Sequence, residues 1–385
     1  MIKPIPISQV TLGMYIVDIP GHDLLGIRQQ GLIRNPQILR VMQQRGVESV
    51  MVDFDRSSVS LHPKTEEKAK VKRQIKPAPI KQELPRAQKL YDEARQLQQR
   101  TMESLYQGDT IDLEEVDDTA DKFIDSVFRN DSALSCLRLI KDKDDYLLEH
   151  SIGVAILMVM FGRHLGLSGE ELHHLCVGSL LHDIGKIKIP EKILNKPGKL
   201  TDAEFTIMKS HAMHSREIIK ATPGINKISL DVAAQHHEKL DGSGYPSGLR
   251  GDQISRYGRM ITICDIYDAM TADRVYRRGL TGPQALKRLL DMAPHQLDNE
   301  LLHQFINCIG VYPPGSFVEL SNGVIAIVLE SKANPLLPLV KVIYNTHIGT
   351  HIMVEELDLS SSSNSEKIVR AVKPEEFRLN PKNYV

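Results

Sequence analysis

Between positions 130 and 310, apolar helical segments alternate with short polar breaks. The breaks fall at residues 166–168, 195–198 and 241–251. Two of the segments begin with residues typical of helix N-termini: Thr201 followed by Glu204 forms a capping-box pattern, and Ser168 followed by Glu171 forms a weaker one. The pattern predicts that this region is helical almost throughout.

A second helical pattern, which we treat as a connector over residues 87–129, precedes this region. In its first half, apolar residues recur at steps of three or four with one gap, at Ala87, Leu90, Ala94, Leu97 and Leu105. A further helix is predicted around residues 111–128. Such stripes usually pack on the core of their own chain, but an exposed stripe could instead pair with a second copy and form a homodimer.

The first 55 residues predict a small α/β domain, which could serve as a docking or regulatory module. Residues 14–19 and 49–53 are strand-like, and a helix from Pro36 to Arg45 is predicted between them. Residues 56–86 mix lysines with prolines, a composition typical of a flexible basic linker. A basic run can also contact nucleic acid, but without aromatic residues or a folded frame we expect no such contact.

After residue 310 the pattern changes from helices to strands. Residues 316–320 and 324–329 flank an Asn322-Gly323 turn and predict a β-hairpin, and residues 339–344 predict a third strand. We therefore expect a short C-terminal β extension over residues 311–385. The fold class predicted for the whole chain is mainly α.

Composition narrows the classes of protein that fit. The 385 residues carry a formal net charge of −1, so no overall field favours nucleic acid or an anionic membrane. The four cysteines are scattered without a CxxC pair, which fits a reducing compartment. The longest apolar run, residues 152–161, is shorter than the roughly 20 residues that span a bilayer. With no apolar signal-peptide core at the start, we expect a cytoplasmic protein without a membrane partner.

Histidines and aspartates supply the candidate chemistry. Nine of the fifteen histidines lie between positions 150 and 237. Seven residues lie in or beside apolar helical segments, where an unpaired imidazole or carboxylate is costly to bury. They are His150, His182, Asp183, His211, His236, His237 and Asp265. A shared metal centre satisfies all of them, although a single histidine on such a face is more often a satisfied core residue.

Five imidazoles and two carboxylates are too many ligands for one tetrahedral zinc ion. They suit two divalent ions bridged by a carboxylate, and nitrogen and oxygen ligands without thiolate favour iron or manganese. Two such ions activate a bridging water as hydroxide and stabilise charge during attack at phosphorus. Lys186, three residues after Asp183, could hold a phosphate oxygen or the nucleophile, or could form an ordinary surface salt bridge; Gly185 beside it is expected to keep the approach open.

Two further segments are candidates for substrate contact. The glycine-rich loop 241–251 follows His237 closely, and Tyr245 within it offers a ring face for a purine, although such a loop alone is a weak signal. Arg274 and Arg277 follow Asp265 and could bind phosphates or guanine edges. The alternative for these cations is a solvated basic face.

Three long motifs together resemble the HD-GYP family, a subgroup of the HD superfamily of metal-dependent phosphohydrolases. They are HDIGKIKIPEKILNKPGKLTDAEF (182–205), HHEKLDGSGYPSGLRGDQI (236–254) and DIYDAMTADRVYRR (265–278). The resemblance covers about residues 130–310 and implies an all-helical HD core. It also implies hydrolysis of cyclic di-GMP to linear pGpG or on to GMP. Residues 1–55 resemble a domain of unknown function that often precedes HD-GYP domains.

The resemblance also assigns roles to residues. One metal ion would be held by His150, His182, Asp183 and Asp265, and the other by His211, His236 and His237, with Asp183 as the bridge. Asp183 and Lys186 would be catalytic, and Lys186, Tyr245, Arg274 and Arg277 would contact the substrate. Family members with a third ion carry a glutamate four residues before the first histidine, where this chain has Tyr146, so we expect two ions.

Two alternatives to cyclic di-GMP hydrolysis stay open at this point. Some family members hydrolyse 3′,3′-cyclic GMP-AMP, and the few pocket side chains that select a purine are not evident from the sequence. A catalytically silent receptor for a cyclic dinucleotide belongs to a different class of function. The intact ligand set argues against the receptor, because loss of activity commonly removes a ligand first.

Overall fold

The computed structural model describes residues 2–7, 10, 13–19, 31–33, 38, 42, 45, 47, 49–54, 56–57, 75–139, 146–273, 278–331, 334, 336–362 and 364–384. The chain divides into two compact units, Met1–Gln74 and Ile75–Val385.

The first unit contains a four-stranded antiparallel sheet with the order β1-β4-β2-β3. Its strands are β1 (Ile2–Pro6), β2 (Tyr15–Asp18), β3 (Gly31–Leu32) and β4 (Ser49–Asp53). β2 and β4 confirm the two predicted strands, and β1 was not predicted. Of the helix expected over residues 36–45, Ile38 and Met42 are helical, while most of its other residues lie outside the described part of the chain.

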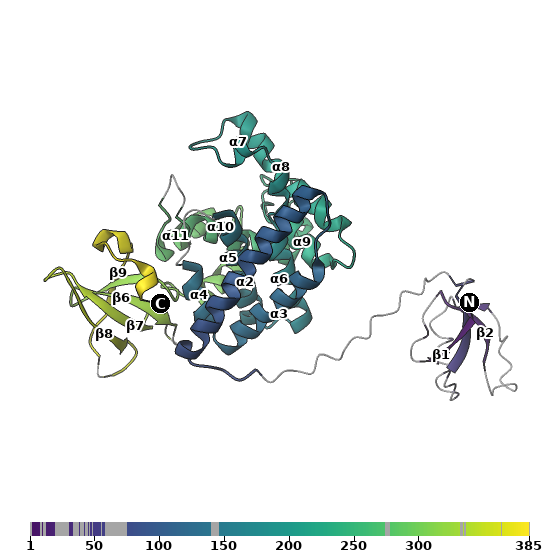
Figure 1. Cartoon of the computed structure of the whole chain (residues 1–385), viewed down its shortest axis with the longest axis horizontal. Coiled ribbons are helices and arrows are strands. Elements are labelled where there is room, and N and C mark those ends of the chain that lie inside the picture. The colour runs from purple at the N-terminus through teal and green to yellow at the C-terminus, as the bar shows by residue number, and fades with distance from the viewer. Residues whose placement is uncertain are drawn as a thin grey trace. The chain divides into compact units, whose positions relative to one another are not determined.

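The second unit is mainly helical, as the sequence predicted, and most of its helices are labelled in Figure 1. Its α-helices are α2 (Ile80–Gln107), α3 (Leu113–Arg129), α4 (Asp131–Leu139), α5 (Tyr146–His164), α6 (Gly169–Leu181), α7 (Glu191–Leu194), α8 (Asp202–Ala221), α9 (Lys227–Gln235), α10 (Arg256–Thr271), α11 (Gly282–Met292) and α12 (Asn299–Ile309). Short 3₁₀ helices occur at η2 (Ile184–Lys188), η3 (Gly251–Gln253), η4 (Pro374–Phe377) and η5 (Pro381–Asn383).

α5 is the central helix of this unit. It is apolar on all sides, and residues 150–162 are buried throughout, which identifies it as a core helix. It packs against α2, α3, α4, α6, α10 and α12. The apolar run at 152–161 is thus buried by protein, and no helix in the described residues is long and apolar enough to cross a membrane.

α2 lies along α3, α4 and α5 (Figure 1). It begins at Ile80, so the last residues that we assigned to the linker are helical, because Ile80 and Glu83 are buried against the core. The stripe from Ala87 to Leu97 is buried by its own chain, which leaves it no exposed seam for the homodimer that we considered. Gln98 anchors the helix by donating a 2.7 Å hydrogen bond from Nε2 to the buried carbonyl of Leu180 on α6.

Capping explains where two of the core helices begin. Ser168 precedes α6 and Thr201 precedes α8, and each takes part in a complete capping box with the glutamate three residues later. In each box the hydroxyl accepts from the glutamate amide and the glutamate accepts from the cap amide, so two otherwise unpaired amides are satisfied. Both predicted capping signals are confirmed.

The C-terminal part of the second unit contains an antiparallel sheet with the order β8-β7-β6-β5-β9. Its strands are β5 (Phe317–Leu320), β6 (Val324–Glu330), β7 (Leu339–Asn345), β8 (Thr350–Asp358) and β9 (Ile368–Val372). β5 and β6 confirm the predicted hairpin and β7 the predicted third strand, but β8 and β9 were missed. β8 is largely exposed at the sheet edge and carries Glu355 and Glu356, so no buried alternation marks it.

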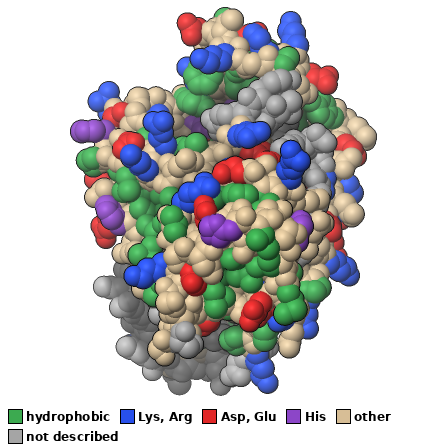
Figure 2. Space-filling view, turned by 90° about the vertical axis from the view of Figure 1, so that its left-hand side faces the viewer, with side chains coloured by type: hydrophobic (Ala, Val, Ile, Leu, Met, Phe, Trp, Pro, Cys, Tyr) green, Lys and Arg blue, Asp and Glu red, His purple; other side chains and the backbone are tan. Residues whose placement is uncertain are grey.

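The molecular surface carries both signs of charge. On the face drawn in Figure 2, Lys and Arg side chains are interspersed with Asp and Glu side chains, and hydrophobic side chains lie between them. This mixture accords with the formal net charge of −1. No single-sign patch dominates the face that is shown.

Gly178 allows α6 to lie close to α9, and we predict that a side chain there destabilises the core. A Cβ at Gly178 would approach the backbone oxygen of Ser229 to 2.7 Å and its Cα to 2.8 Å. Gly178→Ala should therefore lower the free energy of unfolding by about 1–3 kcal/mol, measured by chemical denaturation followed by circular dichroism. Gly169→Ala, on the same helix with no atom within 4 Å of its added Cβ, is the matched control. Equal stability of the two variants would contradict the close approach.

His173 joins α6 to α3 through two carboxylates. Its Nδ1 lies 2.7 Å from Asp121 and its Nε2 lies 3.0 Å from Asp117. Burial opposes protonation of the ring, but the hydrogen bonds to the two aspartates outweigh burial and raise the pKa of His173 to about 9. Although it lies among the clustered histidines, this residue is held by a salt bridge.

We predict that His173 makes stability depend on pH. Because its folded pKa lies above the unfolded value of about 6.5, the stabilisation is complete below about pH 6.5 and is lost as pH rises through about 9. The difference in unfolding free energy between the wild type and His173→Gln should shrink across that window. His303→Gln, at an exposed site on α12, should show no comparable trend. Parallel pH curves for the wild type and His173→Gln would refute the salt bridge.

Candidate metal centre

The two adjacent pairs of candidate ligands directly follow the C-terminal ends of two helices. α6 ends at Leu181, directly before His182 and Asp183, and α9 ends at Gln235, directly before His236 and His237. A helix C-terminus carries partial negative charge from its unpaired carbonyls, so positive charge is favoured beside it. The positions at which these pairs leave their helices are therefore suited to cations.

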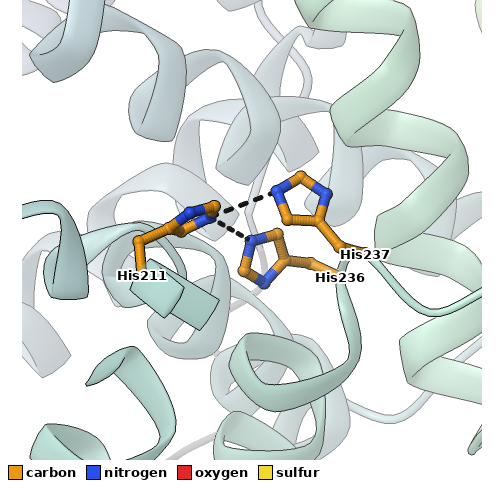
Figure 3. Close-up of side chains that lie close together, drawn as sticks. All are labelled: His211, His236 and His237. Atoms are coloured by element: carbon orange, nitrogen blue, oxygen red, sulfur yellow. Dashed lines mark hydrogen bonds between the residues drawn. The ribbon is translucent and has the colours of Figure 1, made fainter. Parts of the chain in front are cut away.

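The first cluster comprises His211, His236 and His237 (Figure 3). The Nε2 atom of His211, on α8, lies 3.3 Å from that of His236 and 3.2 Å from that of His237. His211 and His236 are buried and His237 is half-buried. Three imidazole nitrogens from two separate segments thus converge on one point.

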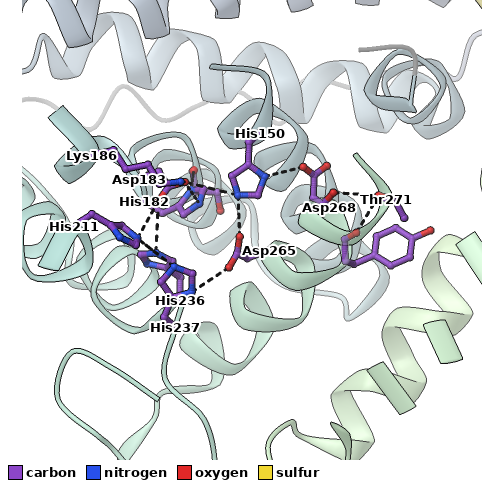
Figure 4. A network of polar contacts seen from close by, with 12 residues as sticks. His150, His182, Asp183, Lys186, His211, His236, His237, Asp265, Asp268 and Thr271 are labelled. Atoms are coloured by element: carbon purple, nitrogen blue, oxygen red, sulfur yellow. Dashed lines mark hydrogen bonds and ion pairs between the residues drawn. The ribbon is translucent and has the colours of Figure 1, made fainter. Parts of the chain in front are cut away.

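The second cluster comprises His150, His182 and Asp183 (Figure 4). All three residues are buried. Oδ2 of Asp183 lies 3.4 Å from Nε2 of His182 and 3.8 Å from Nε2 of His150. Its other oxygen, Oδ1, lies 3.3 Å from Nε2 of His211 and 3.8 Å from Nε2 of His236. The carboxylate of Asp183 therefore presents one oxygen to each cluster.

Asp265, on α10, also lies between the two clusters. Its Oδ1 is 2.9 Å from Nε2 of His150, and its Oδ2 is 3.4 Å from Nδ1 of His237. The structure thus brings all seven predicted ligands together from three helices, α5, α8 and α10, and from the turns that follow α6 and α9. The contact between Asp265 and His237 was not anticipated.

Backbone carbonyls fix the ring orientation of three of these histidines. The Nδ1 atoms of His182, His211 and His236 lie 2.6–2.7 Å from the carbonyl oxygen three residues earlier. An Nδ1–H that donates to a carbonyl leaves Nε2 as a lone-pair acceptor, which is the tautomer that binds a metal ion. Nε2 of His182 and Oδ1 of Asp183 are buried without a hydrogen-bond partner among the described residues, so the donor set fits divalent cations.

Four of the five imidazoles have pKa values that agree with that arrangement. For His150, burial acts to lower the pKa, but hydrogen bonds to Asp265 and Asp268 outweigh burial and raise it. Burial lowers the pKa of His182, His211 and His236, and it lowers the pKa of His237 to about 3. These imidazoles are neutral near pH 7, which is the state required of a metal ligand. For Asp183, burial acts to raise the pKa, but the Lys186 ammonium and neighbouring histidines outweigh burial and hold the pKa well below its usual range.

Lys186 contacts Asp183 directly. Its Nζ donates to Oδ2 of the carboxylate, and its side chain is only 14% exposed. The segment is the 3₁₀ helix η2 rather than an α-helix, and three residues per turn still place Lys186 over Asp183. A mostly buried ammonium beside two imidazole clusters differs from the ordinary surface salt bridge that we considered.

Gly185 has a different role from the one that we expected. A Cβ there would lie 2.2 Å from the carbonyl oxygen of His211 and 2.3 Å from the amide nitrogen of Ser215. The residue is buried against α8, so it allows close helix packing and does not open a path for a ligand. The hydroxyl of Ser215 accepts a 2.9 Å hydrogen bond from the Gly185 amide and fixes the two segments together.

Glu238 shapes the glycine-rich loop and was missed in the sequence. This buried carboxylate accepts hydrogen bonds from the amides of Ser247 at 2.7 Å and Leu249 at 2.9 Å. Gly244 is required because a Cβ there would lie 2.4–2.6 Å from backbone atoms of residues 237–239. The ring of Tyr245 consequently packs on His237, with 4.6 Å between the ring centroids.

Two other predicted substrate residues cannot be placed. Arg274 and Arg277 lie outside the described residues. The described residues add Asp268 and Arg138 to the site, and neither was predicted from the sequence. Asp268 follows Asp265 by one helical turn, a spacing that could have indicated it, whereas Arg138 has no local signal.

Comparisons with known proteins agree with this geometry. Residues 135–301 match the HD domain family, and residues 2–116 match a domain of unknown function, DUF3391. A cyclic di-GMP phosphodiesterase of Pseudomonas aeruginosa is 32% identical over 380 residues, which cover 96% of this chain and 92% of the relative. A 3′3′-cGAMP-specific phosphodiesterase of Vibrio cholerae is 35% identical over 190 residues, covering 48% of this chain and 41% of that protein.

A solved structure supports the fold. An HDGYP protein from Bdellovibrio bacteriovorus aligns with a TM-score of 0.50 and 16% identity, over 80% of this chain and 99% of that one. The fold and the histidine–aspartate clusters thus define an HD-domain phosphohydrolase, a class of enzyme that binds divalent metal ions. Within that class, the chain belongs to the HD-GYP phosphodiesterases that carry an N-terminal DUF3391 domain. The DUF3391 match extends past residue 55 and through α2 into α3.

Proposed function

We propose that the protein hydrolyses cyclic di-GMP at a centre of two divalent metal ions. The observation that carries the proposal is the carboxylate of Asp183, which directs one oxygen to each of two buried ligand clusters. The Pseudomonas relative, a cyclic di-GMP phosphodiesterase that aligns with nearly the whole chain, supports the choice of substrate.

The ligand assignment follows the two clusters. We propose that one ion is held by His150, His182, Asp183 and Asp265, and the other by Asp183, His211, His236 and His237. Nitrogen and oxygen donors without thiolate favour iron or manganese. When bound, two such ions would activate a water for attack at phosphorus and stabilise charge on the phosphate oxygens.

The chain's own residues would position the substrate. The Lys186 ammonium lies beside Asp183, where it can donate to a phosphate oxygen, so we propose it as both a catalytic and a substrate-binding residue. Tyr245 covers His237 and would contact the substrate at the edge of the cluster. We propose that Arg274 and Arg277 bind phosphate or guanine, on the strength of the family motif alone.

The product and the preferred purine are separate parts of the proposal. Cleavage of one phosphodiester gives linear pGpG, and cleavage of both gives GMP. The Vibrio relative, named as specific for 3′3′-cGAMP, supports that dinucleotide as a second candidate substrate. Both clusters retain their predicted donors, which argues against a receptor without catalysis. Residues 1–55 are proposed as a regulatory module.

Turnover by protein purified without oxygen and loaded separately with Fe²⁺ or Mn²⁺ tests the proposal. Cyclic di-GMP and 3′,3′-cyclic GMP-AMP would be assayed side by side, with pGpG and GMP resolved by chromatography. We expect chelator-sensitive hydrolysis and two ions per chain. Three tightly held ions would contradict the two-metal site, and tight dinucleotide binding without turnover would favour the receptor.

Asp183→Ala should remove the shared ligand, so we predict that turnover falls by at least about 10³-fold and that metal content drops below two ions per chain. Metal analysis and a turnover assay on the same preparation measure both effects. Asp252→Ala removes a carboxylate that is fully exposed and serves as the control. Normal turnover by Asp183→Ala would refute the two-metal mechanism.

Lys186→Met should weaken catalysis and leave the metal ions in place. We predict a loss in kcat/KM of about 10²–10³-fold, since one charge-stabilising donor contributes on that order. Lys188→Met, an exposed lysine on the same 3₁₀ helix, is the matched control. Steady-state kinetics with metal analysis separates the effects: a loss of metal from the Lys186 variant would show that the ammonium acts by holding Asp183.

A further inference from the structure

His150 differs from three other histidines of the site in what holds its ring. The Nδ1 atoms of His182, His211 and His236 face carbonyls three residues earlier in the chain, so local helical geometry orients them. Nδ1 of His150 instead lies 2.8 Å from Oδ2 of Asp268, which belongs to α10. The orientation of His150 therefore depends on a contact between separate helices.

Asp268 is itself held by a buried cation. The carboxylate has no solvent exposure, and its Oδ1 lies 3.1 Å from Nη1 of Arg138 on α4. The Arg138 side chain is 1% exposed, and the same Nη1 also lies 3.4 Å from the hydroxyl of Thr271. A buried carboxylate needs a positive partner to remain ionised, and Arg138 supplies one without contacting the ligand clusters directly.

α4 is fixed on its other side by the C-terminal sheet. Cys136, two residues before Arg138, is buried with its Sγ 3.9 Å from the carbonyl oxygen of Val328 on β6. A Cβ at Gly315 would lie 3.0 Å from the Cα and carbonyl oxygen of Cys136, so the chain entering β5 also packs closely there. A continuous series of buried contacts thus runs from the sheet through Arg138 and Asp268 to His150.

We infer that Asp268 and Arg138 are positioning residues that set the metal affinity of the His150–His182–Asp183 cluster, with Asp268 aligning the imidazole of His150 and Arg138 holding Asp268. A carboxylate that accepts from the distal nitrogen of a ligating histidine fixes its tautomer and raises its basicity, and loss of such a partner lowers affinity about 10–100-fold. The inference rests on the proposed metal centre, and it assigns the effect to one of the two metal positions.

Titration of the metal-free full-length protein with Mn²⁺, by calorimetry and by metal analysis after gel filtration, tests the inference. Asp268→Asn should weaken one of the two Mn²⁺ equivalents by about 10–100-fold and leave the other unchanged. Arg138→Met should do the same, and Arg138→Lys, which retains the charge, should recover part of the affinity. If Asp268→Asn does not fold, Arg138→Lys and Arg138→Met decide the question by the same titration.

The control is another buried carboxylate–arginine pair of the same unit. Glu83 is fully buried and its carboxylate oxygens lie 2.7 and 2.9 Å from the guanidinium of Arg129, so Glu83→Gln breaks a comparable pair between α2 and α3. It should lower the unfolding temperature without changing either Mn²⁺ equivalent.

Unchanged binding of both equivalents in the Asp268 and Arg138 variants would overturn the inference, and so would an equal loss of affinity in Glu83→Gln. A wild type that binds two Mn²⁺ ions with the predicted variant effects, but leaves cyclic di-GMP intact, would uphold the inference and refute the proposed substrate. A wild type that binds no Mn²⁺ would overturn both.

Discussion

The metal centre depends on one constraint: nitrogen and oxygen lone pairs of several buried side chains lie close together and repel one another. Nε2 of His211 lies 3.3 Å from Nε2 of His236 and 3.2 Å from Nε2 of His237, and it also lies 3.3 Å from Oδ1 of Asp183. Such a group of acceptors is stable in a dry interior only when the surrounding fold holds it together and cations satisfy it. The close packing of α6 on α9 and of η2 on α8 holds these groups together. Gly178 and Gly185 permit this packing, because neither position has room for a side chain.

The sequence predicted the parts of the structure that depend on local rules. Capping residues marked the starts of α6 and α8, the Asn322-Gly323 turn marked the β5–β6 hairpin, and unusual polar residues on apolar segments marked the candidate ligands. The parts that it missed depend on tertiary contacts. In the sequence, Arg138 does not differ from any other helical arginine, because its partner Asp268 lies on α10. The role of Gly185 was misjudged because the packing of α8 against it is a tertiary contact. β8 was missed because an exposed edge strand has no buried face to impose alternation.

The ligands differ in how rigidly they are prepared for a cation. His182 and His236 follow helices that end directly before them, and each ring is fixed by its own helix. The ring of His150 is oriented by Asp268, so a displacement of α10, or of α4 through Arg138, would change that orientation. Within the His150–His182–Asp183 cluster, His182 is thus fixed by short-range geometry, whereas His150 is fixed by the packing of helices that are distant in sequence. Mutations in the C-terminal sheet would consequently be felt unequally by the two clusters.

The hydrogen bond from Gln98 to the carbonyl of Leu180 bears on where the folded catalytic unit begins along the chain. The stretch that matches the HD family starts at residue 135, yet α2 starts at Ile80 and contributes to the same hydrophobic core. A fragment cut at the family boundary would expose the apolar surface that α2 and α3 cover. It would also remove the hydrogen bond that holds the last turn of α6, the helix directly before His182. The start of the family match, at residue 135, and the start of the hydrophobic core, at α2, are therefore different. A catalytic fragment meant to fold by itself would have to include α2.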